Sequence, residues 1–151
     1  MTLNTRTKRT PCVGICSTTY GDLVCRGCKR FAHEIVQWNG YEPAQRDAVW
    51  QRLTDLQATV VSQHVLVADR AAFEVRLDEA ALASSLQEST PAAQLYALLA
   101  YLAVRSERLS DAGLAQSGGE DGEALTVLKA VDGEIYTRSL AHYERNFKVP
   151  V

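Results

Sequence analysis

The chain has 151 residues, a length that predicts one domain or one domain with a small appendage, and it is 46% hydrophobic and 23% charged. This composition is typical of a globular protein and excludes the disordered, collagen-like and coiled-coil classes. The net charge is −2, but residues 1–30 carry six basic side chains and one acid, a net +5, whereas the remainder carries ten basic and seventeen acidic side chains, a net −7. A polyanion is therefore expected to meet the N-terminal part first.

The apolar pattern argues against a membrane protein. The longest apolar-rich stretch, residues 92–104, includes Gln94 and is shorter than the roughly 18 residues that a membrane-spanning helix needs. The N-terminus is basic but has no apolar core of the kind that a secretory signal contains. We expect a cytoplasmic protein without membrane contact, in which thiols stay reduced.

The N-terminal third predicts a small knuckle followed by a helix. Residues 1–10 are basic and lack apolar periodicity, as in a flexible arm. The Ser, Thr, Gly and Asp residues of segment 17–22 favour a tight turn, and we expect a short β-hairpin there. In segment 29–38 the apolar residues are spaced four and three apart, which predicts a helix that ends at Asn39-Gly40.

The middle of the chain predicts two more helices. Pro43 suits the first position of a helix that continues to Val60 with apolar residues at helical spacing. Residues 65–67 could open a strand, but the pattern favours a helix over residues 69–86 with Asp69 as its cap.

The C-terminal third predicts the last two helices. Ser89-Thr90-Pro91 is a helix start signal, and residues 92–104 are apolar nearly all round, as expected of a buried helix. Residues 117–122 are the most linker-like run in the chain. Residues 124–147 favour a helix over the alternative, a β-hairpin across Asp132-Gly133, because the helical period extends further.

The predicted fold is mainly α: a helical body of about five helices with a small N-terminal four-cysteine metal knuckle, in which a short β-hairpin leads into a helix. Three parts are expected along the chain. They are a flexible basic arm at 1–10, a metal-binding module with two helices at 11–61, and a helical body at 62–151.

All four cysteines of the chain lie within 17 residues, as two close pairs: Cys12, Cys16, Cys25 and Cys28. In a reducing compartment this spacing favours a metal site over disulfides. Structural zinc is preferred, because two short cysteine loops can deliver four thiolates to one tetrahedral ion. An iron–sulfur cluster also takes four thiolates, although the spacing matches neither common ferredoxin pattern. A thiol redox pair at Cys25 and Cys28 is a third alternative.

The strings Pro11-Cys12-Val13-Gly14-Ile15-Cys16 and Cys25-Arg26-Gly27-Cys28-Lys29-Arg30, with Glu34, Trp38, Arg46 and Arg52, form a recognisable pattern. It resembles the YdhL-like family of small bacterial proteins, a domain of unknown function that is catalogued as predicted iron–sulfur proteins. The resemblance covers residues 11–55. It implies a bacterial cytosolic protein with the four cysteines as metal ligands, and it implies no reaction.

Other candidate residues surround the knuckle. The basic residues that could contact nucleic acid or an acidic protein surface are Arg6, Lys8, Arg9, Arg26, Lys29 and Arg30. Trp38 and Tyr41 could stack on bases, or could instead join the knuckle to its neighbouring helix. His33 could support a sulfur ligand or simply face solvent, and Glu34 is expected to be an ordinary surface carboxylate.

No Ser or Cys is placed with a His and an acid as in a nucleophilic enzyme, so no catalytic residue is predicted. Three functions stay open: a metal-binding adaptor, an iron–sulfur protein with an electron-transfer or redox-sensing role, and a structural subunit of a larger complex.

Overall fold

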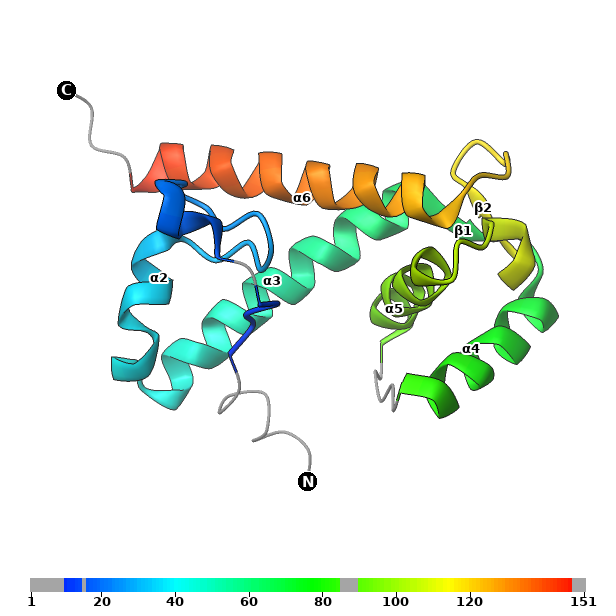
Figure 1. Cartoon of the computed structure of the whole chain (residues 1–151), viewed down its shortest axis with the longest axis horizontal. Helices are drawn as coiled ribbons and strands as arrows, with labels where there is room; N and C mark the ends of the chain where they lie inside the picture. Colours follow the sequence, from blue (N-terminus) through cyan, green and yellow to red (C-terminus); the bar gives the residue numbers. More distant parts are fainter. Residues whose placement is uncertain (1–9, 15, 85–89, 148–151) are drawn as a thin grey trace. The chain divides into compact units, whose positions relative to one another are not determined.

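The computed structural model describes residues 10–14, 16–84 and 90–147, and helices dominate it (Figure 1). The mainly α prediction is confirmed. The described residues form five α-helices, α2 (Ala32–Gln37), α3 (Pro43–His64), α4 (Arg70–Ser84), α5 (Pro91–Val104) and α6 (Ala124–Asn146). They also form three 3-10 helices, η1 (Ser17–Tyr20), η2 (Trp38–Gly40) and η3 (Leu109–Ala112), and two strands, β1 (Val65–Val67) and β2 (Leu114–Gln116).

The chain divides into two compact units. The first contains the described parts of Met1–Asp55 and Glu134–Val151, and the second is Leu56–Gly133. Both ends of the chain therefore contribute to the unit that holds the cysteines. The predicted flexible arm, apart from Thr10, lies outside the described residues.

The core of the second unit is built on α5, as its apolar sequence predicted. Thr90 caps this helix, since its hydroxyl accepts a hydrogen bond from the backbone N–H of Ala93. Leu98, Leu99 and Leu102 are fully buried. No helix in the described part of the chain is long and apolar enough to cross a membrane.

A short antiparallel pair of strands joins two segments of the second unit that are far apart in sequence. Val65 pairs with Gln116, and Val67 pairs with Leu114. Just before β2, Gly113 has φ 69°, and a Cβ atom there would lie 2.3 Å from the carbonyl oxygen of Asp69. Only glycine fits this approach. The strand option at 65–67 is thus confirmed, whereas its partner strand was not predicted.

Two aspartates of the second unit, Asp69 and Asp121, accept hydrogen bonds at a helix start and in a turn. Asp69 caps α4 as predicted, since its carboxylate accepts from the N–H of Ala72. The linker-like run 117–122 is tied back by Asp121, which accepts from Arg108 at 2.9 Å and from the hydroxyl of Ser110 at 2.8 Å. This run is a hydrogen-bonded turn within the unit.

The predictions for segments 17–22, 29–38 and 124–147 have different outcomes. The β-hairpin expected at 17–22 is wrong: this segment forms η1 and a turn, and the β-type pairing among its described neighbours is one bridge between Val24 and Phe31. The following helix begins at Ala32 rather than at Lys29, because residues 25–30 form a tight loop. In contrast, α6 is continuous through Gly133, so helix rather than hairpin is correct there.

The burial of α5 leads to a stability prediction. Leu98→Ala should lower the free energy of unfolding by about 2 to 5 kcal/mol, because it removes a fully buried side chain and leaves a cavity. Denaturant unfolding followed by circular dichroism measures this. Val104→Ala, at a position that is 87% exposed on the same helix, is the control and should change stability by less than about 0.5 kcal/mol. A cost under about 1 kcal/mol for Leu98→Ala would contradict its assignment to the core.

Candidate metal centre

The second cysteine pair lies in a tight loop that reverses the chain. The N–H of Cys25 donates to the carbonyl of Arg30 at 2.9 Å, and the N–H of Lys29 donates to the carbonyl of Cys25 at 2.9 Å. Lys29 adopts a left-handed conformation, with φ 66°. These features place Cys25 and Cys28 on one closed turn, immediately before α2.

The sulfur of Cys25 lies at the centre of this loop. The residue is 1% exposed, and the backbone N–H groups of Cys28, Ser17 and Gly27 form hydrogen bonds with its thiol, as does the side chain of Cys28. Burial alone raises the pKa of the Cys25 thiol, but these hydrogen bonds outweigh it and bring the pKa down to about 7. The loop therefore stabilises a thiolate.

Cys28 is also buried, and its partner is a cation. The Nε atom of Arg30 donates to its sulfur at 3.3 Å. Burial raises the pKa of Cys28 above the usual range for a thiol, and the hydrogen bond and charge of Arg30 offset only part of this rise. The second pair is thus two buried neighbouring sulfurs, of which the loop stabilises the thiolate form at Cys25 but not at Cys28.

The first pair has only local contacts. The Cys16 sulfur is 2.8 Å from the hydroxyl of Thr18, and the exposed Cys12 sulfur accepts from the N–H of Gly14 at 3.3 Å. All four cysteines are free thiols. Within residues 10–14, 16–84 and 90–147, no three His, Cys, Asp or Glu side chains are gathered where one metal ion could bind them. The structure thus brings together the second pair but not the four predicted ligands.

Two of the predicted polyanion-binding cations are used inside the loop. Lys29 is 8% exposed and donates to the carbonyl of Gly27 at 2.9 Å, while Arg30 is 3% exposed. Arg26 is exposed but pairs with Asp22 at 3.2 Å. Arg6, Lys8 and Arg9 lie outside the described residues.

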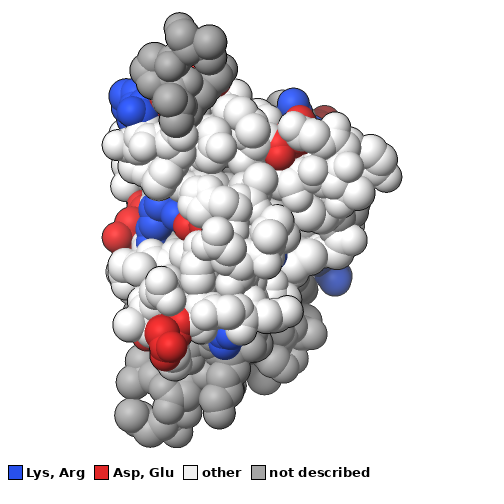
Figure 2. All heavy atoms as spheres, turned by 90° about the vertical axis from the view of Figure 1, so that its left-hand side faces the viewer, with Lys and Arg blue, Asp and Glu red and all other residues white. Residues whose placement is uncertain are grey.

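The charged side chains that are visible on one face of the molecule are scattered (Figure 2). Figure 2 shows one face of the molecule, on which the charged atoms of the described residues lie in small separate groups among uncharged ones. A continuous basic surface is not visible on the described part of this face.

Trp38 is part of the interior rather than an open stacking platform. It is 6% exposed, and the guanidinium groups of Arg30 and Arg46 lie over its ring at 4.9 and 5.9 Å from the centroid. Arg46 also donates to the Trp38 carbonyl at 3.0 Å, and the Tyr41 ring lies 6.2 Å from the Trp38 ring. These contacts join η2 to α3, which is the packing role that the sequence offered as the alternative to base stacking.

Glu34 has a role that the sequence did not indicate. The expectation of a surface carboxylate is wrong: the residue is 5% exposed and accepts from the N–H of Phe31 at 2.9 Å. Both terminal nitrogens of Arg52 donate to its carboxylate, at 2.5 and 2.7 Å. Glu34 is the third residue of α2, after the capping residue Phe31. A Glu at this position is a known helix-start signal, which could have identified its capping role from the sequence.

A cluster of five rings lies beside the loop, and it contains Phe31, His33, His142, Tyr143 and Phe147. The rings of His142, Tyr143 and Phe147 lie 5.7, 5.4 and 5.3 Å from that of Phe31. His33 packs on Phe147 at 5.0 Å, so it is part of this cluster.

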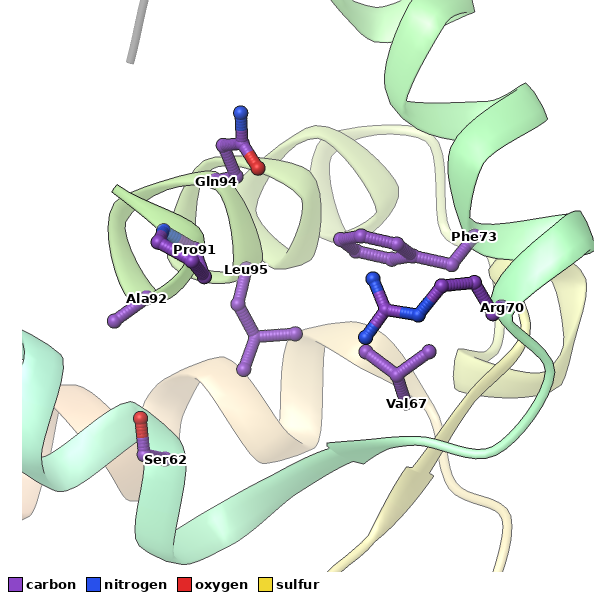
Figure 3. Close-up of a pocket in the computed structure, with 8 residues that line it drawn as sticks. All are labelled: Ser62, Val67, Arg70, Phe73, Pro91, Ala92, Gln94 and Leu95. Carbon is purple, nitrogen blue, oxygen red and sulfur yellow. The ribbon is translucent and has the colours of Figure 1, made fainter. Parts of the chain in front are cut away.

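The second unit has a small cavity of about 190 Å³ (Figure 3). Arg70 extends alongside the Phe73 ring, and Leu95 and Val67 supply further apolar lining. The lining residues include one cation and no carboxylate, cysteine or histidine. This cavity therefore contains no catalytic arrangement of the usual kind.

Comparison with known proteins finds a family model that matches the cysteine segment. Residues 10–57 match the model of the family described as "Protein of unknown function (DUF1289)". The matched range is about a third of the chain and contains the four cysteines, Glu34, Trp38 and Arg52. No curated protein and no solved structure matches the chain.

The buried carboxylate of Glu34 leads to a second prediction. Glu34→Gln should lower the stability of the first unit by about 1.5 to 3 kcal/mol, because charge-assisted hydrogen bonds with Arg52 are lost. Amide exchange in α2 and in the N-terminal half of α3 measures this. Asp22→Asn, which breaks the exposed pair with Arg26, is the control and should cost less than about 1 kcal/mol. Equal effects of the two substitutions would show that Glu34 has no special role.

Proposed function

We propose that residues 10–57 form a metal-binding module in which the thiolates of Cys12, Cys16, Cys25 and Cys28 hold one zinc ion. The observation that carries this proposal is the Cys25–Cys28 loop, where two sulfurs are buried together and three backbone N–H groups meet one of them. Hydrogen bonds of this kind offset the negative charge that thiolate ligands bring to a zinc site. Arg30 offsets it further at Cys28.

The donor set fits such an ion in chemistry, and the site requires the first pair to rearrange. Cys16 precedes Ser17, whose N–H already bonds to the Cys25 sulfur. The contacts of the Cys16 and Cys12 sulfurs with Thr18 and Gly14 are local and can be exchanged for metal ligation. In this proposal the first pair moves to close the site, whereas the sulfurs of the second pair already lie together in the loop.

An iron–sulfur cluster on the same four thiolates is the second candidate, and the buried Cys25–Cys28 pair favours it equally. We propose this option together with the finer assignment to YdhL-like proteins, whose resemblance implies a cluster. A cluster would give an electron-transfer or redox-sensing role, whereas zinc would give a structural one.

The metal proposal predicts one zinc ion per chain in the purified protein. Cys28→Ser and Cys25→Ser should each abolish stoichiometric binding and unfold the loop, since structural zinc contributes on the order of 10 kcal/mol to small metal modules. Elemental analysis and a visible spectrum of anaerobically prepared protein measure the metal, and amide exchange measures folding.

The control variant is His64→Ala, which should keep the metal because His64, at the end of α3 in the second unit, is not a proposed ligand. Visible absorption with bound iron would favour the cluster over zinc. Protein that binds neither metal, and whose loop amides exchange equally in wild type and Cys28→Ser, would refute the proposal.

We further propose that the module serves as an adaptor for a protein rather than for nucleic acid. Three apolar side chains of the first unit stand open to solvent: Val13 at 65%, Tyr20 at 88% and Val36 at 84% exposure. Of the cations in the cysteine loop, Lys29 and Arg30 are buried, and the exposed Arg26 is paired with Asp22. Exposed apolar groups favour a protein partner, whereas nucleic acid requires accessible cations.

A titration of fluorescent single-stranded RNA at two salt concentrations tests this preference. We expect only weak binding, on the order of 10⁻⁴ M or weaker at physiological salt, and a loss of no more than a few fold in Arg26→Ala. The matched control is Lys129→Ala, a cation on α6 in the second unit. Tight binding with a steep salt dependence that Lys29→Ala abolishes would contradict the preference for a protein.

A further inference from the structure

The C-terminal part of α6, from Glu134 onward, belongs to the same compact unit as the cysteine loop. Figure 1 shows this end of α6, in red, beside the blue segment that precedes α2. It lies outside the range 10–57 that the family model matches. The chain therefore supplies to the cysteine module a helix that is not part of the matched segment.

The first contact between this helix and the loop is made inside the cysteine pair. Arg26 lies between Cys25 and Gly27, and its guanidinium lies 4.4 Å from the centroid of the Tyr136 ring. The backbone N–H of Arg26 donates to the Ser17 hydroxyl at 2.8 Å. Tyr136 thus contacts the exposed residue whose backbone links the two cysteine segments.

The second contact is made where the loop ends. Phe31 pairs with Val24 across the base of the loop and follows Arg30, which donates to the Cys28 sulfur. The ring of His142 is stacked on that of Phe31 with an interplanar angle of 9°. The ring of Phe147 lies within 6.2 Å of the four other rings of the cluster.

We propose that residues 136–147, the C-terminal part of α6 with the residue that follows it, act as a clamp that keeps the sulfurs of Cys25 and Cys28 buried and raises the affinity of the module for its metal. The part concerning metal rests on the proposed function, whereas the part concerning burial does not. Coupling of this kind is reciprocal. If the clamp raises metal affinity by some factor, bound metal must favour docking of this helix end by the same factor.

The burial half is tested with metal-free, full-length protein. The rate of alkylation by iodoacetamide is measured at each cysteine by mass spectrometry. In Phe147→Ala we expect Cys25 and Cys28 to react about tenfold faster than in wild type, because buried thiols react through local opening. Cys12, which is already exposed, is the internal standard and should not change.

Two further variants keep this test decisive. Tyr136→Leu removes the ring under Arg26 but keeps an apolar side chain, and it should raise the same two rates if the first contact matters. Leu125→Ala is the control, since Leu125 is 44% exposed on α6 against 47% for Phe147 and lies in the other unit. Unchanged rates at Cys25 and Cys28 in both Phe147→Ala and Tyr136→Leu would overturn the clamp.

The metal half is tested by zinc competition with a chromophoric chelator and by amide exchange. Phe147→Ala should bind zinc about tenfold more weakly, and zinc should slow exchange of the amides at 140–147 in wild type. Faster alkylation with unchanged zinc affinity would overturn the coupling. Faster alkylation in a protein whose wild type binds no metal would support the clamp and refute the proposed function.

Discussion

The first unit depends on the hydrogen bonds that the buried carboxylate of Glu34 accepts. This carboxylate accepts the N–H of Phe31, which fixes the start of α2 directly after the cysteine loop, and it receives both terminal nitrogens of Arg52 from α3. The Arg52 guanidinium in turn lies 4.2 Å from the centroid of the Phe31 ring. One buried acid thus fixes the end of the loop, the direction of α2 and the contact with α3, and a carboxylate so buried is stable only with these partners.

The sequence predicted the elements whose signals are local. The spacing of apolar residues indicated α3, α5 and α6, and Asp69 indicated the cap of α4, because a helix records its face and its first turn in neighbouring residues. Strand β2 was missed because its partner β1 is about fifty residues away. The hairpin at 17–22 was wrong because turn-forming residues suit a 3-10 helix as well as a reverse turn.

The candidate site was predicted in its residues but not in its arrangement. Cysteine spacing indicated a paired set of thiols, and the structure places Cys25 and Cys28 together in one loop. Charge was misleading, since Lys29 and Arg30 were candidates for contact with a polyanion and Glu34 was expected at the surface, although each of the three is buried with a partner. The ring cluster depends on contacts between residues 31 and 142–147, which no local pattern encodes.

The left-handed conformation of Lys29 restricts how this loop can vary in evolution. At φ 66° a β-branched side chain would crowd its own backbone, so valine, isoleucine and threonine are strongly disfavoured at this position. Glycine and asparagine would enter this region more easily than lysine. Lysine adds one thing that glycine lacks, the hydrogen bond from its ammonium to the carbonyl of Gly27. Glycine at this position would therefore keep the direction in which the loop closes and lose that hydrogen bond.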